Sequence, residues 1–258
     1  MGHERIGFLP RSNQWKRIVA QLVSFEGDNN SVKQISENTL QAIRNTYEKM
    51  QFDESVIKAI SFLATLSFSA KQENQADYLN ANGYTVDSNI SLYSLISSAQ
   101  EFITTEKGSL EINKLAKDAA LQAVIVYQKE HSSGQLTFWG EPNNVWKSVG
   151  TGAAFCELAR SFFAAFTDRQ LKYYLDRSAA SSIGDYAKLQ LFSKQISEYT
   201  KEISDHAFDI SKIMQSFAAG WFNKNAAKAL PDKRKIRGFL NHSFGKLREE
   251  FLREREDK

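Results

Sequence analysis

Four cations stand close together near the end of the chain, at Lys233, Arg234, Lys235 and Arg237. Side chains of these types contact the phosphates of nucleic acids or an acidic patch on a partner protein. Pro231 predicts a helix that begins here, and cations are unfavourable at the positive end of a helix dipole. The cluster therefore does not help its helix to form, and we hypothesise that it contacts nucleic acid or an acidic partner. A solvated helix face is the more common reason for a short basic run.

Other residues that carry chemistry in proteins form no recognisable site in this sequence. Gly150-Thr151-Gly152 lacks the third glycine and the preceding strand of a dinucleotide-binding fingerprint, so we expect no nucleotide there. The single cysteine, Cys156, lies among apolar residues and is typical of a small buried side chain. The histidines have no spacing suited to zinc, although Glu202 and His206 would share one helix face. We therefore predict no catalytic residue, no metal and no cofactor.

An apolar repeat runs from Asp185 to Lys228 and predicts one long helix. Its apolar residues recur at intervals of three or four, at Leu189, Phe192, Ile196, Tyr199, Ile203, Ala207, Ile210, Met214, Phe217 and Trp221. A heptad seam of this kind packs into the core of its own domain or against a partner helix. If the first half protrudes, Phe192, Ile196 and Tyr199 would bind the partner. Packing within the chain is the more common arrangement.

The length of this repeat predicts an irregularity. One helix over 185–228 would span roughly 66 Å at about 1.5 Å per residue, whereas a globule of this size is about 45–50 Å across. Ser204 and Asp205 lie where the repeat gains an extra four-residue step, and both residue types cap helices. We therefore expect the helix to be kinked near 204, to protrude, or to cross two lobes.

Two further helices accompany this repeat in the C-terminal half. A segment rich in glycine, alanine and phenylalanine over 150–166 predicts a helix that another helix can approach closely, and we expect Ala218 to Gly220 to pack against it. The capping-box spacing of Thr167 and Gln170 predicts that this helix ends there. An apolar stripe from Ile236 to Phe251 predicts an amphipathic C-terminal helix that carries the basic cluster.

The chain as a whole has the pattern of an all-α protein. Only three prolines occur, at Pro10, Pro142 and Pro231, and helix interiors exclude proline. Apolar residues at helical spacing follow capping residues such as Ser12. We predict a multi-helix bundle of about eight to ten helices. It is divided into an N-terminal lobe over 1–141 and a C-terminal lobe over 142–258, or forms one continuous domain.

Composition narrows the class of protein. Of the 258 residues, 42% are hydrophobic and 24% are charged, as in ordinary globular domains. The net charge of +3 is too small to imply a polyanionic partner by itself. A single cysteine fits a reducing compartment, and the sequence has neither a secretory signal nor an apolar run long enough to cross a membrane. We expect a cytoplasmic protein without membrane contact.

Three classes of function fit these features. The first is a non-catalytic helical adaptor or subunit of a multi-protein complex, which docks on a protein partner or on a second copy through the heptad repeat or the C-terminal helix. A complex that acts on nucleic acid, such as a bacterial defence assembly, is one such setting. The second is a nucleic-acid-binding module that uses the basic C-terminal helix. The third is an enzyme whose site is built from residues distant in sequence, which a deep pocket with converging ionisable groups would reveal.

Overall fold

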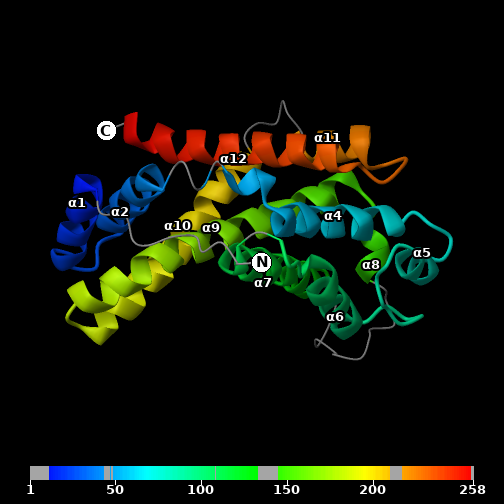
Figure 1. The fold of residues 1–258 in the computed structure, drawn as a ribbon, viewed down its shortest axis with the longest axis horizontal. Helices are drawn as coiled ribbons and strands as arrows, with labels where there is room; N and C mark the ends of the chain where they lie inside the picture. Colours follow the sequence, from blue (N-terminus) through cyan, green and yellow to red (C-terminus); the bar gives the residue numbers. More distant parts are fainter. Residues whose placement is uncertain are drawn as a thin grey trace.

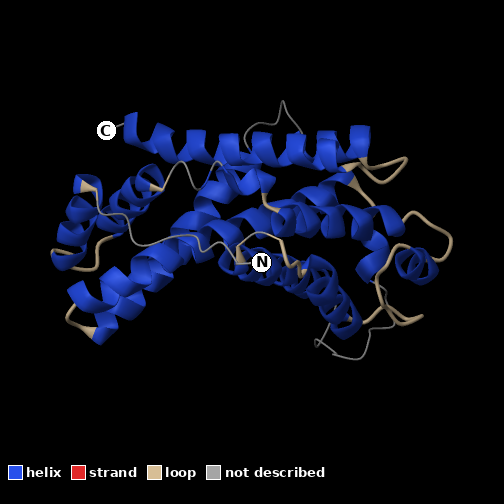
Figure 2. Ribbon diagram, in the orientation of Figure 1, coloured by secondary structure: helices blue, strands red, loops and turns tan. Residues whose placement is uncertain are grey.

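The computed structural model describes residues 12–43, 47, 49–107, 109–132, 145–209 and 217–256, with the backbone alone at 206–209 and 250–256. Within these ranges the chain forms eleven α-helices, one 3-10 helix and no β-strand (Figure 2). The elements are α1 (Asn13–Val23), α2 (Asn29–Ala42), η1 (Met50–Phe52), α4 (Glu54–Ser69), α5 (Gln75–Ala81), α6 (Leu92–Ile103), α7 (Leu110–His131), α8 (Val145–Ser148), α9 (Gly152–Ser182), α10 (Tyr186–Asp209), α11 (Phe217–Asn225) and α12 (Lys233–Glu256). The predicted all-α multi-helix bundle is confirmed.

Several helices begin at the capping residues that the sequence indicates. Ser12, Asp53 and Ser109 cap α1, α4 and α7, and each side chain accepts a hydrogen bond from a backbone N–H of the first turn. α5 lies in a polar segment, where Asn74 caps it by accepting the Asp77 N–H at 3.2 Å. So short a helix has no room for an apolar repeat, which is why sequence periodicity did not predict it.

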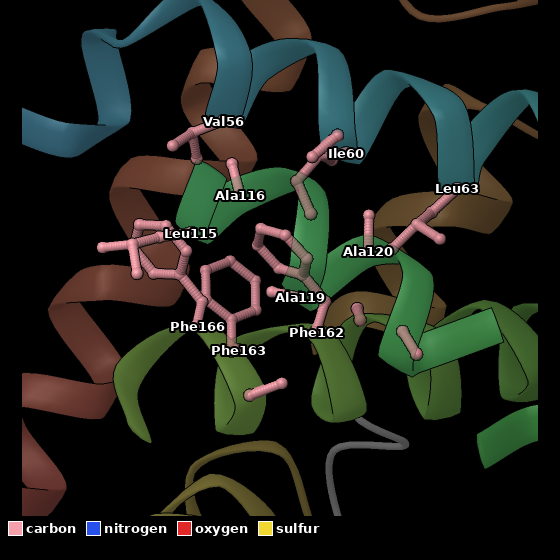
Figure 3. Close-up of a cluster of buried hydrophobic side chains, with 14 of the residues drawn as sticks. Val56, Ile60, Leu63, Leu115, Ala116, Ala119, Ala120, Phe162, Phe163 and Phe166 are labelled. Atoms are coloured by element: carbon pink, nitrogen blue, oxygen red, sulfur yellow. The ribbon is translucent and has the colours of Figure 1, made fainter. Parts of the chain in front are cut away.

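α9 lies at the centre of the bundle (Figure 1). Its most extensive contacts are with α7 and α10, and α1, α2, α4 and α11 also pack against it. Figure 3 shows the centre of the core, where three phenylalanines of α9 meet alanines of α7 and aliphatic residues of α4: Phe162, Phe163, Phe166, Ala116, Ala119, Ala120, Val56, Ile60 and Leu63. The small side chains of α7 leave room for the rings, so large and small residues interlock.

α9 continues past the position where the sequence predicted its end. The capping-box spacing of Thr167 and Gln170 predicted a helix boundary, and this prediction is wrong because α9 is continuous from Gly152 to Ser182. Both side chains are buried, and the Thr167 hydroxyl lies 3.3 Å from the Tyr47 hydroxyl. A capping side chain acts only where backbone N–H groups lack partners, and the interior of a helix offers none.

The apolar repeat of 185–228 is described as two helices, α10 and α11. Residues 210–216 between them lie outside the described part of the chain. Helical structure in α10 continues through Ser204, whose hydroxyl donates a hydrogen bond to the Arg160 carbonyl of α9 at 2.9 Å. Ser204 therefore forms a hydrogen bond between α10 and α9 and does not cap a new helix.

The predicted contact between the small residues of α9 and α11 is confirmed. A Cβ atom on Gly152 would lie 2.9 Å from the carbonyl oxygen of Ala219 and from the side-chain amide of Asn223, so the two backbones approach closely only because this residue is glycine. Phe155, one turn later, stacks on Phe222 with ring centroids 5.1 Å apart. These contacts pack α11 closely against α9.

α12 covers the core and presents its opposite face to solvent. Its apolar stripe is buried and consists of Ile236, Phe239, Leu240, Phe244 and Leu247. The Phe244 ring lies 5.3 Å from that of Phe163 on α9. Asp232 caps the helix by accepting the Lys235 N–H at 2.8 Å, so Pro231 precedes the helix and does not lie in its first turn. Because the stripe faces inward, Lys233, Arg234, Lys235, Arg237 and Gly238 face outward.

The buried side chains form one contiguous hydrophobic cluster that extends from Trp15 to Leu247. α7, from the predicted N-terminal lobe, packs against α9 of the predicted C-terminal lobe. The boundary predicted between 141 and 142 falls in the segment 133–144, which lies outside the described residues. The division into two lobes therefore remains a prediction.

Candidate functional site

The four predicted basic residues lie together in the first turns of α12. Lys233, Arg234, Lys235 and Arg237 are all exposed, while Ile236 between them is fully buried. Burial of the apolar stripe sets the rotation of α12 and so determines which residues face outward. The packing of this helix therefore presents the cluster to solvent.

Only Lys233 of these four cations has an anionic partner within the described residues. Lys233 forms an ion pair with Glu54 at the start of α4, and the Arg237 guanidinium lies 5.8 Å from the centroid of the Phe52 ring. No described carboxylate lies within ion-pair distance of Arg234 or Lys235. Their charges are therefore available to an anion from outside the chain.

An aromatic ring lies beside the cations. Phe52 ends η1, and its side chain is 58% exposed, whereas Met50 two residues earlier is buried and anchors the turn. η1 packs against α12, which places the ring next to Arg237. We call Lys233, Arg234, Lys235, Arg237 and Phe52 the basic face. Sequence reasoning missed Phe52, because no local pattern connects it to a helix near the other end of the chain.

Two glycines, Gly238 and Gly245, follow the basic face along α12. A Cβ atom added to Gly238 or to Gly245 would have no atom within 4 Å. Glycine in a helix interior destabilises it by roughly 0.5–1 kcal/mol relative to alanine. No close approach within the described residues explains these two glycines.

A second polar region is a cleft of about 520 Å³ between α7, α9 and α10. Small side chains of α9 form part of its lining, and charged or polar residues of all three helices surround them; examples are Ser161, Ala164, Gln122, Glu130, Ser197 and Lys201. A cavity of about 500 Å³ adjoins this cleft and shares Lys194 and Ser197 with it. Each volume is large enough for a small ligand. We call the cleft and the adjoining cavity together the polar cleft.

The charges of the polar cleft are largely paired with one another. The Arg160 Nε lies 3.3 Å from Asp205 Oδ1, and the Lys194 Nζ lies 3.5 Å from Glu198 Oε1. A third pair joins Lys172 and Asp168. These pairs connect α9 to α10 or neighbouring turns of one helix, so they contribute to the fold itself.

Lys172, Ser197 and Asp168 form the most closely connected group of the cleft. The Lys172 Nζ lies 3.0 Å from Asp168 Oδ1 and donates to Ser197 Oγ at 2.6 Å, and the Ser197 hydroxyl donates to Asp168 at 3.0 Å. A serine nucleophile needs a neighbouring base that accepts its proton; here Asp168 accepts the hydrogen bond of Ser197, but the same carboxylate is paired with Lys172, which also donates to Ser197 Oγ. Ser197 also lies within α10, where backbone N–H groups already have helical partners and cannot form an oxyanion hole. The group therefore joins helices and does not resemble a catalytic site.

The residues predicted to bind a partner through the heptad seam are buried. Phe192 is 2% exposed, Ile196 0% and Tyr199 3%. The Phe192 ring lies 5.2 Å from that of Phe25, and the Tyr199 hydroxyl donates to Glu37 of α2 at 3.2 Å. These three residues are therefore buried within the same chain, where Phe192 meets the segment after α1 and Tyr199 meets α2.

The other residues that the sequence singled out are Cys156, the segment 150–152 and the histidines. Cys156 is buried, and Thr151 caps α9 by accepting the Ala154 N–H at 3.1 Å. Among the described residues, no three His, Cys, Asp or Glu side chains gather as a metal site would require. The side chain of His206 lies outside the described part of the chain.

Comparisons with protein families, with curated proteins and with solved structures found no match to this chain. None of the described helices is both long enough and apolar enough to cross a membrane. The function is therefore inferred from the charges and side chains on the surface of the protein.

Proposed function

We propose that this chain is a non-catalytic helical subunit that binds nucleic acid through the basic face and so holds its complex on that nucleic acid. The observation that carries the proposal is the outward cluster of cations in the first turns of α12, of which Arg234 and Lys235 have no described carboxylate partner. A phosphate backbone supplies the regularly spaced negative charge that such a cluster binds.

The position of the cluster strengthens this proposal. Cations at a helix N-terminus oppose the helix dipole, and neighbouring cations repel one another. Among the four, only Lys233 has an ion-pair partner in the described part of the chain. The cluster thus costs the folded chain stability, which a bound polyanion would offset.

The other surfaces support a binding role over a catalytic one. The ionisable groups of the polar cleft pair mainly with each other. Phe192 and Tyr199 of the heptad seam pack against the segment after α1 and against α2. The exposed face of α12, in contrast, groups several cations whose charges remain available.

The test measures affinity for nucleic acid by fluorescence anisotropy at increasing salt. Arg234→Glu/Lys235→Glu should weaken binding at least about tenfold, because two phosphate contacts become repulsive, and wild-type affinity should fall steeply with salt. The matched control is Lys16→Glu/Arg17→Glu, which makes the same charge change on α1, at the other end of the molecule from the start of α12 (Figure 1). Equal losses in the two variants, or no wild-type binding, would contradict the proposal.

A protein partner on the same helix is the second candidate, in keeping with an adaptor. The observation that favours it is the pair of outward glycines, Gly238 and Gly245, because glycine on an exposed helix face allows another backbone to approach closely. Affinity purification with nuclease treatment separates the two candidates. A stoichiometric protein that survives nuclease and is lost from Gly238→Leu/Gly245→Leu would favour the protein partner.

A further inference from the structure

Phe52 differs from the other phenylalanines in the described part of the chain. Its side chain is 58% exposed, whereas most of the other described phenylalanines are buried in the core. An isolated apolar ring on a surface is ordinary by itself. Its place within the basic face is what requires an explanation.

The surroundings of the ring are cationic. The Arg237 guanidinium lies over it at 5.8 Å from the centroid, and Lys233 is held close by through its ion pair with Glu54, two residues after the ring. Arg234 and Lys235 follow on the exposed turn of α12. An exposed aromatic ring among cations is the combination that binds single strands, since bases stack on the ring while phosphates contact the cations.

We infer that the nucleic acid bound at the basic face is single-stranded, with one unpaired base stacked on Phe52 and neighbouring phosphates at Arg234 and Lys235. This inference rests on the proposed function and narrows it to one class of nucleic acid. In a duplex each base is already stacked between its neighbours, and opening it costs energy. A duplex therefore gains nothing from the Phe52 ring, whereas a single strand does.

The experiment compares two probes that differ only in pairing. A labelled DNA strand of about 16 nucleotides, and the duplex that it forms with its complement, are titrated with wild-type protein and with Phe52→Ala. The variant should bind the single strand roughly 5- to 150-fold more weakly, the range that removal of one base–aromatic stack gives. Its affinity for the duplex should stay within about twofold.

Two further variants control for structure. Phe52→Trp keeps a stacking surface and should retain single-strand affinity. Tyr93→Ala removes another exposed aromatic ring, 56% exposed on α6, and should change neither affinity. Thermal unfolding should show that Phe52→Ala is folded, because its side chain packs little.

The outcomes separate this inference from the proposed function. If Phe52→Ala leaves single-strand binding unchanged, or weakens both probes equally, the stacking inference is overturned. The proposed function survives that result as long as Arg234→Glu/Lys235→Glu still removes binding. If the wild-type protein binds neither probe, both are overturned.

Discussion

Charged side chains gather in two regions of the molecule, the basic face at the start of α12 and the polar cleft between α7, α9 and α10. In the cleft, Arg160 pairs with Asp205 and Lys172 with Asp168, so the charges link the helices that carry them. On the basic face, Arg234 and Lys235 have no described partner of opposite charge. The size of a charged cluster is therefore a weaker guide to function than whether its charges are compensated within the chain.

This difference follows from how the two regions are built. The cleft lies where three helices meet, so that half-buried charges must be compensated to offset their desolvation. The basic face lies on the outer turns of one helix, where water solvates each cation and no compensation is required. Solvated cations can exchange water for phosphate at little cost, whereas the paired groups would first have to separate.

Substitution of Asp168 should have the largest effect on stability. Asp168→Ala leaves Lys172 without its carboxylate and removes the hydrogen bond from Ser197, which should destabilise the fold by about 1–3 kcal/mol. Urea unfolding measures this change. The matched control is Asp118→Ala, which breaks the exposed Lys114–Asp118 pair of α7 and should cost less than about 0.5 kcal/mol. Equal effects would show that the cleft pairs are as weak as surface pairs.

Alanine on the outer face of α12 should stabilise the protein. Gly238→Ala and Gly245→Ala should each raise the free energy of unfolding by about 0.5–1 kcal/mol, because neither Cβ meets another atom and alanine favours the helix. Thermal unfolding measures the gain. Gly152→Ala should instead lower the free energy of unfolding, because the added Cβ would lie 2.9 Å from the Ala219 carbonyl oxygen. A decrease in stability at Gly238 would indicate an intramolecular contact on this face.

Asp176, at the edge of the cleft, should give a small pH dependence. Burial raises its pKa above the ordinary 3.8, Lys172 opposes this rise and Asp168 adds to it. Between the pKa of Asp176 in the unfolded state and its higher pKa in the folded state, the folded state binds more protons than the unfolded state. The free energy of unfolding of the protein therefore decreases as the pH increases through that window. Asp176→Asn should be more stable than wild type near neutral pH and equal to it below about pH 3.

The gain should stay below about 1 kcal/mol, because solvent screens this half-buried side chain. Urea unfolding at the two pH values measures it. A larger gain at low pH than at neutral pH would show that the sign is wrong.

Lys194 should matter least, although it lines the cleft. Its pair with Glu198 is exposed on both sides and joins residues one turn apart. Lys194→Ala should change stability by less than about 0.5 kcal/mol and should leave nucleic-acid affinity unchanged. A clear decrease in affinity would extend the binding surface from the basic face into the cleft.

The sequence predicted the all-α class and the amphipathic C-terminal helix with its basic cluster, because caps and apolar stripes are local signals. Ser12 begins a helix as predicted, and burial of the stripe around Ile236 turns the cations outward. The boundary predicted at Thr167 was wrong, since a capping pattern acts only where a helix ends.

Phe52 could not be assigned to the site from sequence. Its neighbourhood depends on contacts such as that between Lys233 and Glu54, which lie 179 positions apart. The cleft likewise requires three helices to meet. Which charges are compensated is therefore a property of tertiary structure.

The uncompensated cations of the basic face should bind phosphate, whereas the paired cations of the polar cleft should not. The most direct test is the slope of log affinity for single-stranded DNA against log salt concentration, in two variants that each remove two cations. Arg234→Gln/Lys235→Gln should reduce the magnitude of the slope by about 1.4, which is about 0.7 for each phosphate that the variant no longer neutralises. Lys172→Gln/Lys194→Gln, which removes two paired cations of the polar cleft, should leave the slope unchanged. Equal changes in both variants, or a change in the cleft variant alone, would contradict this expectation.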